Sequence, residues 1–175
     1  MSQVLGNELT AELLSRLGGR DVESYEGKII PIFTVDEYGW PHPALLSYYE
    51  MVAKSPRTID MALWKNSSTA NNLRQSGKVT LMIIDHALNY YLKGTVSQTE
   101  AEMSGTPAVS RFRVTLEQVI EDQEPNAEII TGLTYRRMSQ RDPNDFAAKV
   151  FRGLKERQCI AGKQSPGSQR QASSV

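Results

Sequence analysis

The chain has 175 residues, and its 20 Lys and Arg balance its 20 Asp and Glu, so its formal net charge is zero. A neutral chain is not a globally basic nucleic-acid binder, and we expect no nucleic-acid partner. Cys159 is the only cysteine, and His42 and His86 are the only histidines. This excludes an intramolecular disulfide framework and argues against a Cys- or His-rich metal site, so we predict no metal.

We expect no secretory signal and no membrane helix in this sequence. No apolar run approaches the roughly 18 residues that a membrane helix requires. Residues 1–7 lack a basic head followed by an apolar stretch, so they do not form a secretory signal. The sequence therefore predicts a soluble cytoplasmic protein with no membrane partner.

The N-terminal part, residues 1–24, is predicted to be a helix with a lead-in to the main domain. Leucines at helical spacing lie within 7–17, and Gly18 and Gly19 follow them. Either Asn7 or Thr10 can cap the start, and the glycines end the helix.

Three strands are predicted next. Residues 28–35 and 41–52 are apolar runs separated by the turn sequence Asp-Glu-Tyr-Gly at 36–39, which indicates a hairpin. Residues 58–64 begin with β-branched side chains and have no helix cap, so they form a third strand.

A short helix is predicted over 67–77, capped by Ser67, Ser68 or Thr69 and ended by Gly77. A nearly continuous apolar strand follows at 78–85, which predicts burial on both faces. The next predicted strand covers 90–98, and Gly94 in its middle indicates a bulge or a close backbone approach.

The strand predicted over 110–123 alternates in hydrophobicity, although Leu116, Val119 and Ile120 also allow a helical turn. Residues 127–137 form either a short helix or a strand that bends at Gly132.

An amphipathic helix is predicted over 144–158, capped by Asp142 or Asn144. Its apolar face consists of Phe146, Val150, Phe151 and Leu154. Residues 161–175 are rich in Ser, Gln and Gly and are predicted to be a disordered tail. The main domain therefore covers 25–160, and its strands, with one short helix among them, favour an antiparallel barrel.

Three hydroxyl side chains, Ser67, Ser68 and Thr69, open the helix at 67–77. A helix N-terminus with adjacent hydroxyls suits a phosphate group, because it presents unpaired N–H groups and a partial positive charge. The alternative is that one of them is only a helix cap, and local sequence favours this alternative.

The order of segments strengthens the phosphate interpretation. The chain reads Asp36-x-x-Gly39 with prolines at 41 and 43, then ALLSYY, IDMALW, SSTANNLRQSGKVTLMII and YYLKGTV. Over about residues 25–137 this pattern resembles the FMN-binding split-barrel family, the pyridoxamine 5′-phosphate oxidase-like flavoproteins. The resemblance implies a mainly β fold, a six-stranded antiparallel split barrel with a few flanking helices.

The resemblance also implies a homodimer with two FMN sites at its interface, and the long apolar strands at 78–85 and 110–122 agree with a dimer. The implied function is that of an FMN-dependent oxidoreductase acting on a small-molecule substrate. The alternatives are a non-catalytic flavin-binding or redox-sensing dimer, and a cofactor-free barrel that serves as an interaction module.

Cofactor-binding residues follow from the same resemblance. The strand before the helix runs beside the ribityl chain and ring, the hydroxyl block meets the phosphate, and the preceding strand faces the isoalloxazine. In chain order, the implied residues are Leu45, Leu46, Ser47, Ala62, Leu63, Trp64, Ser67, Ser68, Thr69 and Asn72.

The chain departs from the family pattern in the phosphate block. Many members have Arg-Lys where this chain has Ser68 and Thr69. The missing charge could come from a nearby cation or from the partner chain of a dimer. The candidates are Lys65, Arg74, Arg57, and Arg111 or Arg113 of the partner subunit. On pattern alone, Trp64 is expected in the core or an interface, and His42 is expected at the surface rather than at a pocket mouth.

Overall fold

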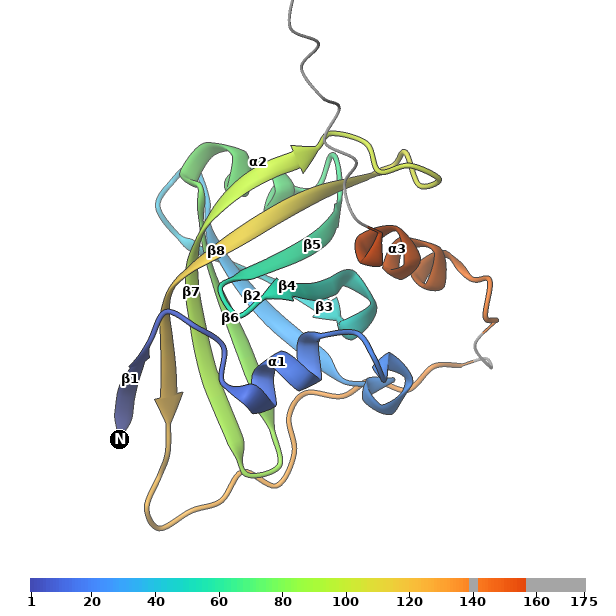
Figure 1. Ribbon diagram of the computed structural model, residues 1–175. Coiled ribbons are helices and arrows are strands. Elements are labelled where there is room, and N and C mark those ends of the chain that lie inside the picture. The colour runs from blue at the N-terminus through green and yellow to red at the C-terminus, as the bar shows by residue number, and fades with distance from the viewer. Residues whose placement is uncertain (139–141, 157–175) are drawn as a thin grey trace, which may run out of the picture.

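A single antiparallel sheet of eight strands forms the body of the protein and curls into a barrel (Figure 1). The computed structural model describes residues 1–138 and 142–156. Seven strands lie in the order β3-β2-β6-β7-β8-β5-β4, and β1 pairs with β8. The strands are β1 (Ser2–Gly6), β2 (Ile29–Val35), β3 (Pro41–Ser47), β4 (Met51–Ser55), β5 (Thr58–Trp64), β6 (Lys78–Asp85), β7 (Leu88–Glu100) and β8 (Val109–Asp122).

Helices cover the openings of the barrel. Within the described residues the α-helices are α1 (Ala11–Leu17), α2 (Ser68–Ser76) and α3 (Phe146–Lys155), and the 3-10 turns are η1 (Val22–Tyr25) and η2 (Tyr48–Glu50). None of the helices in the described ranges has the length and apolar character of a membrane span. The helix starts follow cap chemistry, because Thr10, Ser67 and Asp145 each accept a backbone N–H of the first turn.

The expected split-barrel architecture is confirmed, but the strand number is eight rather than six. One extra strand arises because the predicted strand 41–52 is interrupted. Ser47 and Glu50 form a capping box that turns the chain through η2 and separates β3 from β4. The other extra strand is β1, which the sequence did not predict and which pairs with β8 across 120 residues of chain.

Several local predictions are confirmed. α2 begins after Ser67 and ends at Gly77, whose φ of 63° lies in the left-handed region. The register of β7 on β8 shifts between Lys93 and Gly94. A Cβ at Gly94 would lie 2.6 Å from the carbonyl oxygen of Thr115, so the bulge brings two backbones together.

The helical turn considered for β8 does not form, and neither a helix nor a strand forms at 127–137. This segment instead crosses the end of the barrel as an irregular strap. The strap is joined to β2 by a hydrogen bond from the Ile29 N–H to the Leu133 carbonyl. An isolated β-bridge joins Lys28 to Thr134. Gly132 lies so close to the carbonyl of Ile84 that no larger residue fits there.

The core lies between the inner faces of the curled sheet. Alternate residues of each strand point inward, as the period of two requires. The fully buried side chains include Ile30, Ile32, Ile59, Met61, Leu81, Ile83, Leu92, Phe112, Val114 and Leu116. α1 adds Leu13 and Leu17, and α3 adds Val150 and Leu154. Phe146, predicted on the inner face of α3, is instead 44% exposed. The predicted tail, 161–175, and Cys159 lie outside the described residues.

Candidate functional site

The end of β5 and the start of α2 are joined directly. The Ser67 N–H donates to the carbonyl of Trp64 at 3.0 Å, and the Ser67 hydroxyl accepts the Ala70 N–H at 3.1 Å. Ala62 and Leu63 are buried, whereas the Trp64 side chain is 55% exposed in the single chain. Of the two positions expected for Trp64, the core is therefore wrong, and an interface stays a prediction. The junction therefore places an exposed indole ring next to a helix N-terminus.

The three predicted phosphate-binding hydroxyls take three different positions. Ser67 is the N-cap, Ser68 is exposed, and Thr69 is buried. Asn72 is also buried, and its amide donates to the Thr34 hydroxyl at 3.0 Å. The exposed side chain of this group is therefore that of Ser68, and one of the first-turn N–H groups, that of Ala70, is already bonded by the Ser67 cap.

The predicted cofactor-binding residues of β3 also differ in their exposure. Leu46 is buried in the core, and Leu45 on the outer face is 59% exposed. The Ser47 N–H and hydroxyl donate to one Glu50 carboxylate oxygen at 2.8 and 2.9 Å. Burial raises the pKa of Glu50, although the two hydrogen bonds from Ser47 oppose that change.

A polar groove of about 340 Å³ lies between the β2–β3 turn and α2. One wall is formed by turn residues 36–38 and His42, and the other by Ser68, Asn71, Asn72 and Gln75. His42 is half-buried there, although the sequence favoured a surface position. The α2 residues recur at helical spacing, a polar face that sequence inspection could have found and did not.

None of the cations proposed from the sequence lines this groove. Lys65 is paired with Glu102 at 2.6 Å. The Arg74 guanidinium donates to Gln98 and Asn71, each at 2.8 Å, and lies over the Phe112 ring.

The two candidate arginines on β8 are also engaged in hydrogen bonds within the chain. Arg113 is hydrogen-bonded to Asp60 at 2.7 and 3.0 Å, and Arg111 is buried beneath α3, where it donates to the Gly153 carbonyl. Arg57 is exposed in the β4–β5 turn. The residues that line the groove therefore suit a hydroxylated ligand, because no Lys or Arg is among them, and Arg74 of α2 lies outside the lining.

The exposed face of Trp64 already accommodates a second aromatic ring. Phe146, the first residue of α3, stacks on it with a centroid distance of 4.9 Å and an interplanar angle of 5°. Since both rings are about half-exposed, this stack lies at the surface and not in the core. A planar ligand can be bound by the same type of contact.

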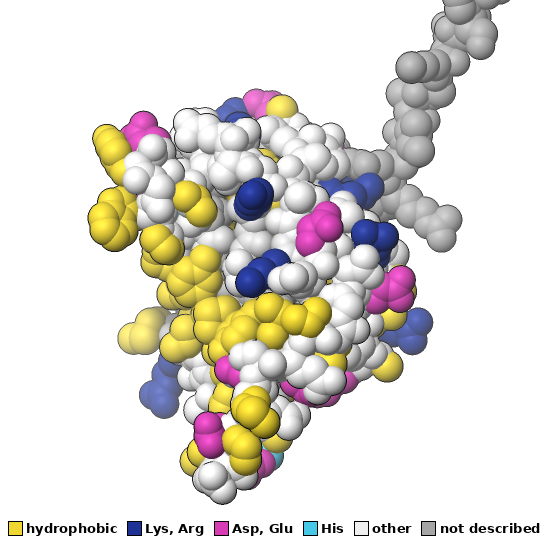
Figure 2. Space-filling view, turned by 90° about the vertical axis from the view of Figure 1, so that its left-hand side faces the viewer, with side chains coloured by type: hydrophobic (Ala, Val, Ile, Leu, Met, Phe, Trp, Pro, Cys, Tyr) yellow, Lys and Arg dark blue, Asp and Glu magenta, His cyan; other side chains and the backbone are white. Residues whose placement is uncertain are grey.

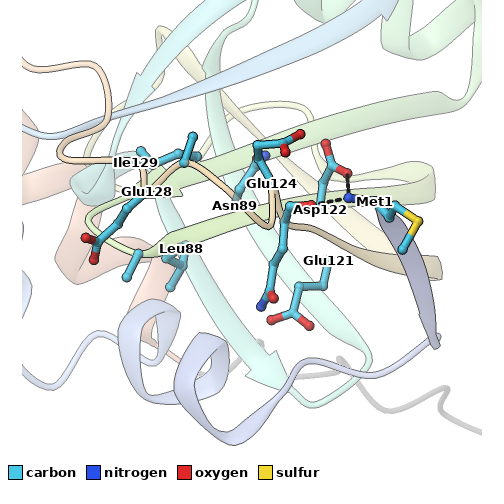
Figure 3. A pocket seen from close by; sticks show the side chains of 11 residues that line it. Met1, Leu88, Asn89, Glu121, Asp122, Glu124, Glu128 and Ile129 are labelled. Carbon is cyan, nitrogen blue, oxygen red and sulfur yellow. Dashed lines mark hydrogen bonds and ion pairs between the residues drawn. The ribbon is translucent and has the colours of Figure 1, made fainter.

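A second hollow of about 420 Å³ lies at the far end of β8 (Figure 3). Its lining includes the carboxylates Glu121, Asp122, Glu124 and Glu128. In Figure 3 the carboxylates of Glu121 and Glu128 lie well apart. Within 1–138 and 142–156 no group of three or more His, Cys, Asp or Glu could hold a metal ion.

Comparison with known proteins supports the fold. The chain matches no family model. It is 26% identical to the uncharacterised protein YclD of Bacillus subtilis over 150 residues, which cover 86% of this chain and 96% of that one.

Two solved structures have a similar fold. One is from Lactobacillus delbrueckii, and its assignment as a pyridoxamine 5′-phosphate oxidase is itself provisional. It matches with a TM-score of 0.55 and 17% identity, and the match covers 68% of this chain and 98% of that one. A variant of HupZ from group A Streptococcus matches with a TM-score of 0.52 and 16% identity over 65% of this chain and 99% of its own. With its strand order and its helix between β5 and β6, the chain thus has the fold of the pyridoxamine 5′-phosphate oxidase-like split-barrel proteins.

Proposed function

We propose that this protein binds a flavin, with FMN as the form indicated by the sequence, and acts as a flavin-dependent oxidoreductase on a small molecule. The observation that carries the proposal is the junction of β5 and α2. There, the exposed Trp64 ring is joined through one backbone hydrogen bond to the N-cap of a helix that borders a polar groove. The junction connects an aromatic plane to a helix with a hydrogen-bonding face, the two kinds of surface that a flavin uses, although Trp64 itself does not line the groove.

The parallel stack of Phe146 on Trp64 supports a ring-binding role. Phe146 covers one face of the indole, so a flavin ring would stack on the opposite face or take the place of Phe146. A bound flavin would supply hydride or electron transfer. The chain would contribute the Trp64 face for the ring and the Ser68 and Asn71 side chains for the hydroxylated part.

Absorbance and titration test the proposal. The purified protein should show flavin absorbance, or the apoprotein should bind added FMN and quench its fluorescence. Trp64→Ala should weaken binding by about 1–2 kcal/mol, the range for losing an aromatic stack. Trp40→Ala is the matched control, because Trp40 is also exposed but lies in the β2–β3 turn outside the groove lining. Absence of flavin binding, or a haem spectrum instead, would contradict the proposal.

Turnover separates the two flavin hypotheses. An oxidoreductase should oxidise NADH or NADPH in the presence of FMN and an acceptor, whereas a carrier or redox sensor should bind FMN without turnover. Stoichiometric flavin binding with no donor oxidation would favour the non-catalytic alternative.

We also propose that the protein is a homodimer, and the outer face of the sheet supports this. A row of apolar side chains crosses six strands on that face. Tyr91 pairs with Met82 on one side and Ile120 on the other, and Ile120 pairs with Val4. On β2 and β3 the row continues through the paired residues Pro31, which is buried, and Leu45, which is 59% exposed.

Charge is distributed unevenly about this apolar row. Lys93 is the next residue after Tyr91 on the same face of β7 and lies toward the α2 end. Asp122 is the next residue after Ile120 on the same face of β8 and lies toward the opposite end. A twofold axis through the row would therefore place lysines of one copy opposite carboxylates of the other. Figure 2 shows this side of the molecule, with hydrophobic side chains across its middle, basic ones directly above them and acidic ones both above and below.

Sedimentation tests the dimer. The wild type should sediment at twice the mass of the 19.6 kDa chain. Met82→Glu should produce monomers, because it places a charge in the centre of the apolar row. Ser104→Glu, in an exposed loop, is the control that should remain dimeric. A wild-type monomer at micromolar concentration would contradict the proposal.

A further inference from the structure

The groove between α2 and the β2–β3 turn has an unusual lining for a site expected to meet a phosphate. It contains three side-chain amides, a hydroxyl and an imidazole, contributed by Asn71, Asn72, Gln75, Ser68 and His42. No Lys or Arg is among the residues that line it. Groups of this kind donate and accept hydrogen bonds without carrying a permanent charge.

The charged residues at this groove are acidic. Asp36 and Glu37 lie in its turn wall together with Tyr38. One carboxylate oxygen of Asp36 accepts the N–H groups of Tyr38 and Trp40 at 3.0 and 2.8 Å, which fixes Asp36 in the turn. Glu37 is exposed and makes no hydrogen bond or ion pair with the described residues. Among the residues that line the groove, a phosphate dianion would meet two negative charges and no cation. Arg74 lies outside the lining, where its guanidinium donates to the lining residue Asn71 and to Gln98.

The helix N-terminus does not reverse this balance. It contributes a partial charge of about half an elementary charge, which is smaller than the charge of either carboxylate. Lys65 lies close in sequence, but its ammonium group is paired with Glu102. Hydroxyl groups, by contrast, can exchange hydrogen bonds with the solvent-accessible polar side chains of the lining without bringing a charge into the groove. Asn72 is not one of these, because it is buried and its amide donates to Thr34.

We propose that this groove recognises the hydroxylated chain of a flavin through neutral hydrogen bonds, so that the protein binds riboflavin at least as tightly as FMN. The inference rests on the proposed flavin-binding function and specifies the ligand form at the same site. Selectivity would come from the carboxylates of Asp36 and Glu37, which disfavour a terminal phosphate, and from the amide-rich face of α2, which binds hydroxyl groups.

The test compares riboflavin and FMN by fluorescence titration of the apoprotein at low and high NaCl. We expect the dissociation constant of riboflavin to be equal to or lower than that of FMN. FMN binding should improve or stay constant as salt rises, because salt screens repulsion between the phosphate and the carboxylates.

A charge reversal sharpens the test. Glu37→Lys should tighten FMN binding by about tenfold and leave riboflavin binding within about twofold, because only FMN carries the charge that the substitution attracts. Glu23→Lys, an equal charge change in η1 outside the groove, should leave the ratio of the two affinities unchanged.

The outcomes are distinguishable. FMN binding at least tenfold tighter than riboflavin, and weaker at high salt, would overturn this inference and leave the flavin-binding function standing. An unchanged affinity ratio in Glu37→Lys would also overturn it. Failure of both flavins to bind would overturn the inference together with the proposed function.

Discussion

Two buried aspartates in this barrel each lie between two basic side chains, yet they stabilise different parts of the molecule. Asp60 is in the middle of β5, where its register partner on β8 is Arg113. Asp85 is the last residue of β6 and is bonded by Arg16 of α1 at 2.7 Å and by Lys28. The first cluster lies within the sheet, and the second attaches the N-terminal helix to it.

The clusters also differ in what lies over them. Arg111, beside Asp60, is only 4% exposed and reaches across to the Gly153 carbonyl of α3, so this cluster lies beneath a helix. At Asp85, the Arg16 and Lys28 side chains remain partly exposed. The ion pairs at Asp60 therefore have a larger desolvation cost than those at Asp85. Removing the Asp60 carboxylate should lower the free energy of unfolding by more than removing that of Asp85.

The largest expected effect is that of Asp60→Ala. It leaves Arg113 without its two hydrogen bonds and Arg111 next to Glu100 alone. Stability should fall by about 3–5 kcal/mol, as for breaking a buried ion pair from one side. Urea unfolding at neutral pH measures this change. The double variant Asp60→Ala/Arg113→Met should recover part of the loss, and a loss below about 1 kcal/mol in the single variant would contradict the ranking.

Asp85→Asn should have a smaller effect, about 2–3 kcal/mol, because Arg16 and Lys28 can turn toward water when their partner is neutral. The same urea experiment applies. His86→Gln is a suitable control, since His86 follows Asp85 but has an exposed side chain. A loss larger than that of Asp60→Ala would reverse the comparison.

Acid should act on the Asp85 cluster in a defined direction. Burial would raise the pKa of Asp85, but hydrogen bonds from Arg16, Lys28 and the His86 N–H outweigh it and lower the pKa to about 2. The pKa of the Asp85 carboxyl is lower in the folded protein than its ordinary value of 3.8. The ionised carboxylate therefore stabilises the fold at pH values above 3.8. That stabilisation, about 2 kcal/mol, is lost as pH falls from about 4 toward 2.

The stability difference between wild type and Asp85→Asn should therefore shrink across this pH range. Urea midpoints at pH 5, 4 and 3 measure it. A difference that stays constant down to pH 3 would show that the carboxylate does not titrate in this way.

The smallest expected effect concerns the attachment of α3. The Lys54 ammonium group donates to the carbonyls of Leu154, Lys155 and Glu156 at the C-terminal end of the helix. Lys54→Met should cost about 0.5–1 kcal/mol, the usual range for a cation at a helix C-terminus. Amide exchange should increase mainly in α3 and leave β5 protected. Equal exchange in β5 would mean that α3 and the Asp60 cluster form one cooperative unit.

The sequence predicted the features of the fold that depend on local signals, and it missed those that depend on contacts between distant segments. The strand that carries Arg113 was identified by its alternating hydrophobicity and the strand that carries Asp60 by its β-branched start, but the pairing between them was not predicted. The α2 boundaries were predicted because Ser67 and Gly77 are local signals. The break between β3 and β4 was missed even though Ser47 and Glu50 have the spacing of a capping box, because the flanking apolar residues suggested one continuous strand.

The candidate site was predicted less well than the fold. The sequence identified the segments that meet there, but the roles of Ser68, Thr69 and Asn72 depend on which way one helix faces. Burial of Thr69 and Asn72 reflects packing of α2 against the barrel, which a local pattern does not determine. His42 enters the groove because β3 turns it toward α2, and that contact depends on tertiary structure.

β8 pairs with three strands, β1, β5 and β7, that are distant from one another in the chain. During synthesis, the earlier strands leave the ribosome with these edges unpaired, and the barrel can close only after residue 122 has emerged. Closure must then bring together segments separated by much of the chain, which slows folding and exposes strand edges in the meantime. A nascent chain that stalls before β8 would therefore present open sheet edges to chaperones or to other copies of itself.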